Sequence, residues 1–447
     1  MTSTASPDFR IFGIRGGLGR GAFVAAYAGL CLLPLLLGRI ARDITGDFAA
    51  ELGAGLGMAA YTMLLASFFL SGRFQTVSGR AGLDGILGMH RLLGFAATAL
   101  IVGHIVVIQA SGNGDAGPAA FIAVAALVLV VFLARARSKI GMRYEYWRLS
   151  HGIGALIVAG AGFAHATGDG YYGSTLTLKI YWSVLLALAV ASLLTVHLVR
   201  PMGRMRQPYR IVDVELVADK TWKIGVEPTQ GDALEFEPGQ YAFLSLDRQP
   251  FMGSGHPFSF SSPPSQRPRV EFTVKENGDF TDTIGDLQPG TEVHLDGPHG
   301  YLSPARYRGP SVDHDGLVLI AGGVGIAPMM SILREGATTG RTKPALLLYA
   351  ANSESDLAYR DELETLTDQL DLTVRYVLSH PPDGWEGDTG HIDDTYLQTH
   401  LTMADAGNRM YFVCGSTGML DAVLDALDRV KTAPSDLIHA ENFSVYD

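Results

Sequence analysis

Two apolar stretches carry a histidine at each end, and they constrain the fold more than any other feature of the chain. The first runs from His90 to His104 and the second from His151 to His165, so the two histidines of each stretch are fourteen residues apart. In an α-helix, fourteen residues turn the chain by about 1400°, within about 40° of whole turns, and rise about 21 Å. The histidines of each stretch therefore share one helix face at two different heights.

An ionisable side chain inside a membrane span is costly and is usually functional. Neutral imidazole is also a common axial ligand of haem iron. Two such helices that run in the same direction pair His90 with His151 and His104 with His165, which predicts two bis-histidine b-type haems stacked across a bilayer. The alternative is that the histidines only form hydrogen bonds between helices, and it does not explain why the same spacing occurs twice.

The composition separates a membrane half from a soluble half. The chain has 447 residues, of which 47% are hydrophobic, and its mean hydropathy is +0.19, as in proteins with a membrane portion. Residues 1–207 hold 17 Lys and Arg against 8 Asp and Glu, and the rest hold 17 against 37, so the net charges are +9 and −20. Nothing in this balance favours a nucleic-acid partner. The two cysteines, Cys31 and Cys414, provide no disulfide framework or cysteine-rich metal site.

Six segments are long and apolar enough to cross about 30 Å of hydrocarbon. The first is interpreted as a span and not as a signal peptide, because its apolar run is long and five more follow. Basic residues gather before the first span, between the second and third, between the fourth and fifth, and after the sixth. The positive-inside rule then places both termini in the cytoplasm, with the chain in the inner (plasma) membrane. The predicted spans are 21–40, 52–71, 86–109, 118–134, 149–167 and 178–199.

From residue 207 the pattern changes to short alternating runs such as YRIVDVELV, RVEFTVK and EVHLDGP, divided by turn residues. They predict an antiparallel β-barrel over 207–309. After about residue 313, strand-like runs such as LVLIAGG alternate with helix-like ones, which predicts a parallel sheet flanked by helices over 313–447. The predicted order is therefore a cytoplasmic segment (1–20), a six-helix transmembrane bundle (21–200), the barrel and an α/β nucleotide-binding domain.

Five motifs of the second half resemble, in order, the flavin and pyridine-nucleotide motifs of the ferredoxin–NADP reductase superfamily. They are HPFSFSS at 256–262, DGPHG at 296–300, LIAGGVGIAPMMSIL at 319–333, YFVCGSTGML at 411–420 and ENF at 441–443. With the histidine stretches in front, the chain from about residue 20 to its end resembles the ferric reductase and NADPH oxidase superfamily, the haem-containing transmembrane branch.

The resemblance implies an FAD site on a barrel strand. The stretch His256, Pro257, Phe258 and Ser259 is expected to hold the flavin, with Phe258 beside the isoalloxazine ring and polar contacts from His256 and Ser259. The alternative is that these aromatic residues only begin a strand and bind no ligand. In the run from Gly278 to Thr281, backbone N–H groups are expected to be free for the flavin pyrophosphate, although Asn-Gly-Asp is also an ordinary turn.

A glycine turn marks the expected nicotinamide site. Gly322, Gly323 and Gly325 follow an apolar strand and precede a helix, where glycines permit a tight turn and close backbone approach to a dinucleotide pyrophosphate. The family pattern is completed by Ile326, Ala327 and Pro328.

Two further residues are the expected catalytic ones, both on grounds of the resemblance. Cys414, followed by Gly415, is expected near the nicotinamide C4, although a buried structural cysteine is the alternative. Phe443 is expected to cover the flavin until nicotinamide displaces it, and Tyr446 is the alternative lid.

The preference between NADPH and NADH is not decided by the residues. NADPH-specific relatives often carry an arginine after the second strand of this domain, and YAANSESD has none. Arg360 and Arg375 are the nearest arginines for a 2′-phosphate, and Glu354 and Asp356 are the candidates for a ribose 2′-hydroxyl. The resemblance favours NADPH.

The expected activity is electron transfer from cytoplasmic NAD(P)H through FAD and two haems to a one-electron acceptor outside. Oxygen, which would be reduced to superoxide, is the preferred acceptor because the external loops show no metal-binding cluster. A ferric or cupric chelate reductase is the first alternative, and an electron donor to a quinone or a periplasmic protein is the second. A transporter with a regulatory flavodomain is disfavoured, because no internal repeat or broken span supports it.

Overall fold

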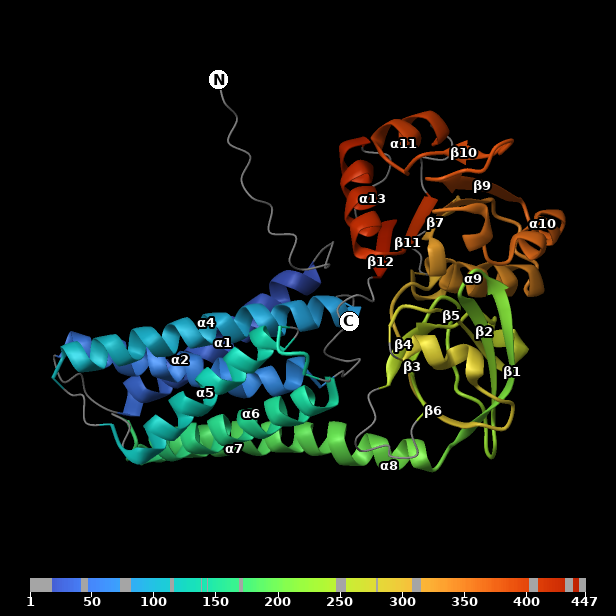
Figure 1. The fold of residues 1–447 in the computed structure, drawn as a ribbon. Coiled ribbons are helices and arrows are strands. Elements are labelled where there is room, and N and C mark those ends of the chain that lie inside the picture. The colour runs from blue at the N-terminus through green and yellow to red at the C-terminus, as the bar shows by residue number, and fades with distance from the viewer. Residues whose placement is uncertain are drawn as a thin grey trace, which may run out of the picture. The chain divides into compact units, whose positions relative to one another are not determined.

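The computed structural model describes residues 18–41, 47–72, 82–112, 116–137, 139–142, 144–168, 172–246, 255–278, 280–307, 315–401, 409–430 and 437–441. The chain divides into two compact units, Met1–Pro201 and Met202–Asp447 (Figure 1).

Long helices make up the first unit. They are α1 (Leu18–Ala41), α2 (Phe48–Leu70), α4 (Gly82–Ala110), α5 (Pro118–Ala136), α6 (Tyr144–Thr167) and α7 (Leu176–Leu194). The last of these continues through a π-helical turn, Thr195–Val199, into the short helix α8 (Arg200–Met205). Local sequence explains two of the starts: Asp47 caps α2 by accepting from the N–H groups of Ala49 and Ala50, and α5 begins with a proline.

Five stretches among the described residues are long and apolar enough to cross a membrane, so the predicted count of six spans is not confirmed. They are Phe48–Leu70, Gly85–Ala110, Pro118–Ala136, Tyr146–Thr167 and Leu176–Gly203. In α1 the corresponding stretch, Val24–Ile40, is shorter. Large apolar side chains project outward from these helices; on α5, Phe121, Val128 and Phe132 are 67%, 61% and 60% exposed. This is the kind of surface that lipid covers.

Helix α2 is central to this unit, because it packs against α1, α4, α6 and α7. Tyr61 of α2 donates a hydrogen bond to the carbonyl of Ala159 in α6, at 2.8 Å, and its ring contacts that of the buried Trp182 in α7. A Cβ atom at Gly162 of α6 would lie 2.7 Å from the Tyr61 ring. Glycine there lets α6 approach α2 closely.

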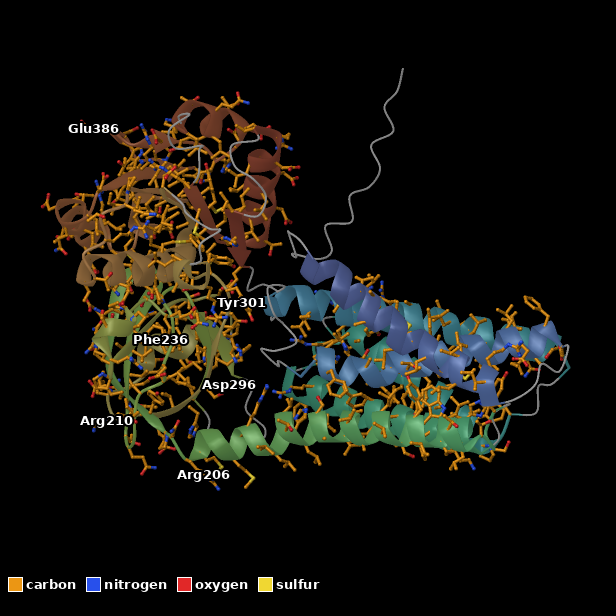
Figure 2. All side chains as sticks on the ribbon, turned by 180° about the vertical axis from the view of Figure 1, so that it is seen from behind. Arg206, Arg210, Phe236, Asp296, Tyr301 and Glu386 are labelled. Carbon is orange, nitrogen blue, oxygen red and sulfur yellow. The ribbon has the colours of Figure 1, made fainter. Side chains whose placement is uncertain are left out.

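An antiparallel sheet begins the second unit. Its strands are β1 (Tyr209–Ala218), β2 (Thr221–Pro228), β3 (Tyr241–Ser245), β4 (His256–Ser259), β5 (Val270–Lys275) and β6 (Glu292–His299), in the order β4-β3-β6-β1-β2-β5. The predicted barrel is not confirmed: the strands form this six-stranded sheet, and one bridge joins Phe260, just after β4, to Phe272 of β5. Phe236 stacks on Phe260 in its core, with ring centroids 4.1 Å apart (Figure 2).

A parallel sheet completes the unit, as the alternation of strand-like and helix-like runs predicted. Its strands are β7 (Gly316–Gly322), β8 (Ala345–Ala351), β9 (Leu372–Leu378), β10 (Asp388–Thr389), β11 (Arg409–Cys414) and β12 (Ile438–Glu441), in the order β10-β9-β8-β7-β11-β12. One face packs against α9 (Ile326–Thr338) and α10 (Arg360–Gln369), and the other against α11 (Asp394–His400) and α13 (Thr417–Val430). The order of strands reverses between β7 and β11, which is where such sheets bind ligands.

Candidate functional site

The four histidines of the helical unit form two pairs. The rings of His90 in α4 and His151 in α6 have centroids 6.2 Å apart, and those of His104 and His165 are also 6.2 Å apart. The ring planes are inclined by 67° in the first pair and 69° in the second. The structure therefore brings together the residues that the fourteen-residue spacing pairs, with one pair at each of two heights along α4 and α6.

A backbone carbonyl orients one of these rings. The carbonyl oxygen of Gly53 in α2 lies 2.7 Å from Nδ1 of His104. Because a carbonyl can only accept, Nδ1 carries the proton of the neutral ring and Nε2 keeps its lone pair. The backbone of α2 comes close here, since a Cβ atom at Gly57 would lie 2.9 Å from the same Nδ1.

Each pair fits the two axial positions of a haem. A transition-metal ion binds an imidazole nitrogen at about 2 Å, so two rings on opposite sides of one ion have centroids about 6 Å apart. Among the described residues, no three His, Cys, Asp or Glu side chains are grouped to hold a metal ion. A metal between two of these histidines would take its remaining ligands from outside the described His, Cys, Asp and Glu side chains, as haem iron does from its porphyrin.

The expected flavin stretch is strand β4, at one end of the antiparallel sheet. The His256 ring stacks on that of Phe280, with centroids 3.9 Å apart, and the Phe258 ring lies 6.1 Å from Phe280. Pro257 pairs with Phe243 of β3, and Ser259 is buried. Phe280 thus connects β4 with the turn that contains Gly278 and Thr281.

The turn differs from the expectation at Gly278, one residue of the run from Gly278 to Thr281, and the expectation for the rest of that run stays a prediction. The N–H of Asn277 donates to Oγ1 of Thr281 at 2.6 Å, and the N–H of Gly278 donates to Oδ1 of Asp282 at 3.1 Å. These two N–H groups are therefore not free for a pyrophosphate in this conformation. Gly278 has φ +114°, a backbone geometry that favours glycine. The reason for the difference is that the Thr and Asp side chains fold back on the turn.

The glycine turn and Cys414 meet at the reversal point of the parallel sheet. Gly322 ends β7, a 3₁₀ turn covers Gly323–Gly325, and α9 begins at Ile326, with Ala327 and Pro328 in its first turn. A Cβ atom at Gly325 would lie 2.2 Å from the Cys414 carbonyl oxygen, and one at Gly415 would lie 3.4 Å from Gly322 Cα. Glycine at position 325 therefore lets the turn after β7 approach the end of β11 this closely.

Glu441 is a further candidate site residue, which the sequence motifs did not single out although it is the first residue of ENF. It lies on β12 directly beside Cys414 of β11, and it is 7% exposed. Its Oε1 accepts a hydrogen bond from the N–H of Tyr301 at 2.8 Å, just after the DGPHG motif; Figure 2 labels Tyr301. The carboxylate therefore connects the two sheets beside the predicted nicotinamide site. Phe443 and Tyr446, the expected lid residues, lie outside the described residues.

Comparison with known families agrees with this geometry. Residues 206–301 match a family described as "FAD-binding domain", and residues 319–425 match "Oxidoreductase NAD-binding domain". The C-terminal half, Met202–Asp447, is therefore similar to flavin- and nicotinamide-dependent reductases, and it is called the reductase half below.

Relatives of this reductase half differ in what they carry besides it. The reductase component of propane 2-monooxygenase from Mycolicibacterium goodii is 31% identical over 49% of this chain and 62% of that protein. Ferredoxin–NADP reductase B from Sorangium cellulosum is 29% identical over 52% of this chain and 96% of that protein. The match thus spans less than two thirds of the first relative and nearly all of the second.

A solved structure resembles a larger part of the chain. The flavohemoglobin from Malassezia yamatoensis, with bound FAD and heme, aligns with 88% of this chain and 98% of its own, with a TM-score of 0.52 and 16% identity. At this identity the likeness concerns the fold alone.

Both arginines considered for a 2′-phosphate in the reductase half are paired with carboxylates. Arg360 forms an ion pair with Glu354, and its guanidinium lies 5.5 Å from the ring centroid of Trp385. Arg375 lies 3.1 Å from Asp388. Among the acidic candidates, Asp356 accepts from Lys275 at 2.6 Å. Burial alone would raise the pKa of Asp356, but the hydrogen bonds from Lys275 and Ser353 outweigh it and hold that pKa below its usual value.

Proposed function

We propose that this protein is a transmembrane NAD(P)H oxidoreductase that holds FAD and two b-type haems and reduces oxygen to superoxide on the far side of the membrane. Its domains are then a cytoplasmic segment (1–20), a transmembrane haem domain (21–200), an FAD-binding barrel (207–309) and an NAD(P)-binding domain (313–447). The termini and the reductase half lie in the cytoplasm, which the distribution of basic residues supports.

Each proposed cofactor has its own set of binding residues. When bound, FAD takes a hydride from NAD(P)H and releases electrons singly, and haem carries single electrons. Strand β4 and Phe280 border the flavin, the turn Gly322–Gly325 admits the nicotinamide pyrophosphate to the start of α9, and Cys414 with Gly415 closes the other side. His90 with His151, and His104 with His165, would hold the two haems through their imidazole nitrogens. The Gly53 carbonyl keeps His104 in the tautomer whose Nε2 binds metal.

The observation that carries the proposal is the pair of identical ring separations, 6.2 Å at both heights. Histidines that only pack between helices have no reason to repeat one separation twice. A soluble reductase also has no use for five apolar helices of spanning length.

The variant His151→Ala tests the haem assignment. We expect the detergent-purified protein to lose the haem between His90 and His151, while NAD(P)H-dependent reduction of soluble dyes by the flavin continues. Haem content per chain and the dye-reduction rate are the two measurements. His197→Ala, a histidine of the same unit outside both pairs, is the control and should keep two haems. Two haems per chain in His151→Ala would refute the pairing.

The acceptor is tested by reducing the loaded protein anaerobically with NADPH and then exposing it separately to air and to a ferric chelate. Fast reoxidation in air that yields superoxide is the expected result. Slow reaction with air and rapid reaction with the chelate would make the protein a ferric or cupric chelate reductase. Slow reaction with both would leave a quinone or a periplasmic protein as the acceptor.

A further inference from the structure

Helix α9 connects the two predicted cofactor sites of the reductase half. Its first residue follows the glycine turn that is proposed to bind the nicotinamide pyrophosphate. Ser331 and Arg334, three residues apart on this helix, lie on one face. That face meets Ser261 and Ser262, which follow directly on the flavin strand β4 and are fully buried.

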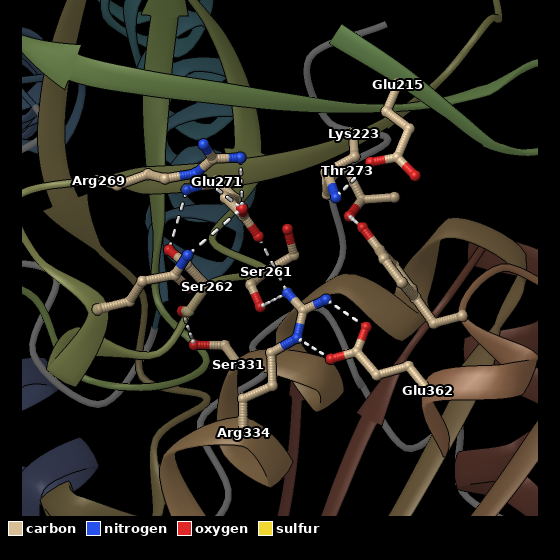
Figure 3. Close-up of polar contacts among 12 residues, drawn as sticks. Glu215, Lys223, Ser261, Ser262, Arg269, Glu271, Thr273, Ser331, Arg334 and Glu362 are labelled. Atoms are coloured by element: carbon tan, nitrogen blue, oxygen red, sulfur yellow. Dashed lines mark hydrogen bonds and ion pairs between the residues drawn. The ribbon is translucent and has the colours of Figure 1, made fainter. Parts of the chain in front are cut away.

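Two consecutive carbonyls of the flavin half are bonded by side chains of α9 (Figure 3). The hydroxyl of Ser331 donates to the Ser262 carbonyl at 2.7 Å, and Nη1 of Arg334 donates to the Ser261 carbonyl at 2.7 Å. The hydroxyl of Ser262 in turn accepts from the N–H of Glu271 in β5 at 2.9 Å. The segment after β4 is therefore held on one side by its own sheet and on the other by α9.

Arg334 also joins carboxylates from both halves. Its Nε and Nη2 donate to the two oxygens of Glu362 in α10, each at 2.6 Å, and its Nη1 lies 3.2 Å from Oε2 of Glu271. The side chains of Arg334 and Glu271 are 12% and 7% exposed. A planar guanidinium can satisfy a carbonyl and two carboxylates at once, which a lysine ammonium on a flexible stem cannot do in this geometry.

The aromatic residue Tyr359 also contacts Arg334. The Arg334 guanidinium lies 4.9 Å from the ring centroid of Tyr359, and the Tyr359 hydroxyl is 2.6 Å from Oγ1 of Thr273 in β5. Tyr359 has φ +62°, in the left-handed region that a bulky residue rarely adopts. The surrounding contacts hold it there, so the same few residues that surround Arg334 also tie the start of α10 to β5.

We propose that Arg334 is a positioning residue for hydride transfer, which fixes the nicotinamide-binding helix α9 against the flavin strand β4. The proposal rests on the proposed flavin and nicotinamide sites. Hydride transfer requires the reacting atoms about 3–3.5 Å apart, and a misplacement of about 1 Å can slow a reaction about 100-fold. A contact between the helix proposed to bind the nicotinamide and the strand proposed to bind the flavin sets that distance, although the contact touches neither the nicotinamide ring nor the flavin ring.

The test compares Arg334→Lys with the unaltered full-length protein in anaerobic single-turnover reduction of the bound flavin by NAD(P)H. We expect the rate at saturating NAD(P)H to fall about 10- to 100-fold. The FAD content and the NAD(P)H concentration for half-maximal rate should stay unchanged. The deuterium isotope effect with C4-deuterated nicotinamide should rise, because hydride transfer becomes more fully rate-limiting.

Arg429→Lys is the matched control. Arg429 forms a comparable two-point pair with Asp394, at 2.5 and 2.7 Å, but both residues belong to the nicotinamide half. The rate of flavin reduction in the Arg429→Lys variant should equal that of the unaltered protein. Ser331→Ala is the milder second variant, which removes only the bond to the Ser262 carbonyl. It should slow flavin reduction several-fold, and it decides the question if Arg334→Lys does not fold.

Two results would overturn the proposal. One is a normal rate per bound flavin in Arg334→Lys and Ser331→Ala, with only a lower melting temperature or FAD content, because Arg334 would then be merely structural. The other is an equal fall in Arg429→Lys. Failure of the proposed function gives a different result: the unaltered protein would not reduce its flavin with NAD(P)H at all.

Discussion

A glycine, Gly57, limits how the His104 ring can lie. The ring is held between the Gly53 carbonyl, 2.7 Å from Nδ1, and the backbone at Gly57, where no side chain intervenes. Partners that orient a metal-binding histidine typically change metal affinity 10- to 100-fold when they are lost. A methyl group at Gly57 would therefore act on the metal site through the ring orientation.

On the proposed haem assignment, Gly57→Ala is expected to weaken selectively the haem that His104 and His165 would hold. The added Cβ atom would lie 2.9 Å from Nδ1, so the ring must turn and lose its bond to Gly53. Haem content should fall toward one per chain, or the potential of one haem should shift in a redox titration. Gly160→Ala is the control, because no atom lies within 4 Å of its added Cβ, and it should keep both haems. Equal titrations for the two variants would contradict the role of Gly57.

At the scale of single residues, the pairing of the four histidines could be predicted from the sequence, but the contacts of their neighbours could not. Helical periodicity alone pairs His90 with His151 and His104 with His165, and the ring separations agree. The contact of His104 with Gly53 had no sequence signal, because any residue offers a carbonyl. At Gly278 the sequence shows that Asp282 follows, but not that its side chain accepts the Gly278 N–H group.

The connection from β8 to α10 contains the polar residues that face a ribose in this class of sheet. Arg360 is the nearest guanidinium to this connection, and Glu354 already pairs with it. A 2′-phosphate therefore competes with a carboxylate for Arg360, so we expect NADPH to gain little over NADH in the unaltered protein.

Glu354→Gln should shift the preference toward NADPH. Freeing Arg360 for a charge-assisted hydrogen bond to the 2′-phosphate is worth about 1.5 kcal/mol or more, so kcat/KM for NADPH relative to NADH should rise roughly tenfold. Steady-state kinetics with both nucleotides measure this ratio. Asp388→Asn, which frees Arg375 instead, is the comparison. A change in Asp388→Asn alone would assign the phosphate to Arg375.

Elements were predicted better than the contacts between them. Glycines after LVLI and the Cys-Gly after YFV indicated two strand ends, and the sheet order puts both at its reversal point. The contacts of Arg334 were not predictable, since SILREGA reads as an ordinary amphipathic helix and its partners in the flavin half lie 63 to 73 residues earlier in the chain. The sixth predicted span, at α1, is not confirmed, because the apolar stretch among the described residues there, Val24–Ile40, is shorter.

The division of the whole molecule at Pro201 and Met202 predicts that the reductase half works alone. Residues 202–447, produced as a separate chain, should be a soluble yellow protein that binds FAD and reduces artificial dyes with NAD(P)H, since a relative of nearly the same extent is a complete reductase. It should contain no haem. Absorption spectra and dye-reduction rates check both points, and aggregation or haem binding by this part would contradict the division.

The separation of the two histidine pairs along α4 has an electrical consequence. Fourteen residues rise about 21 Å, a large part of the roughly 30 Å hydrocarbon layer. If electrons pass between the pairs as proposed, each would carry negative charge outward without a proton, and an inside-negative potential would favour a full crossing by about 2.3 kcal/mol per 100 mV. Turnover on the proposed mechanism would therefore discharge the membrane. In sealed vesicles it should slow as the voltage reverses, and it should recover when an ionophore lets cations follow.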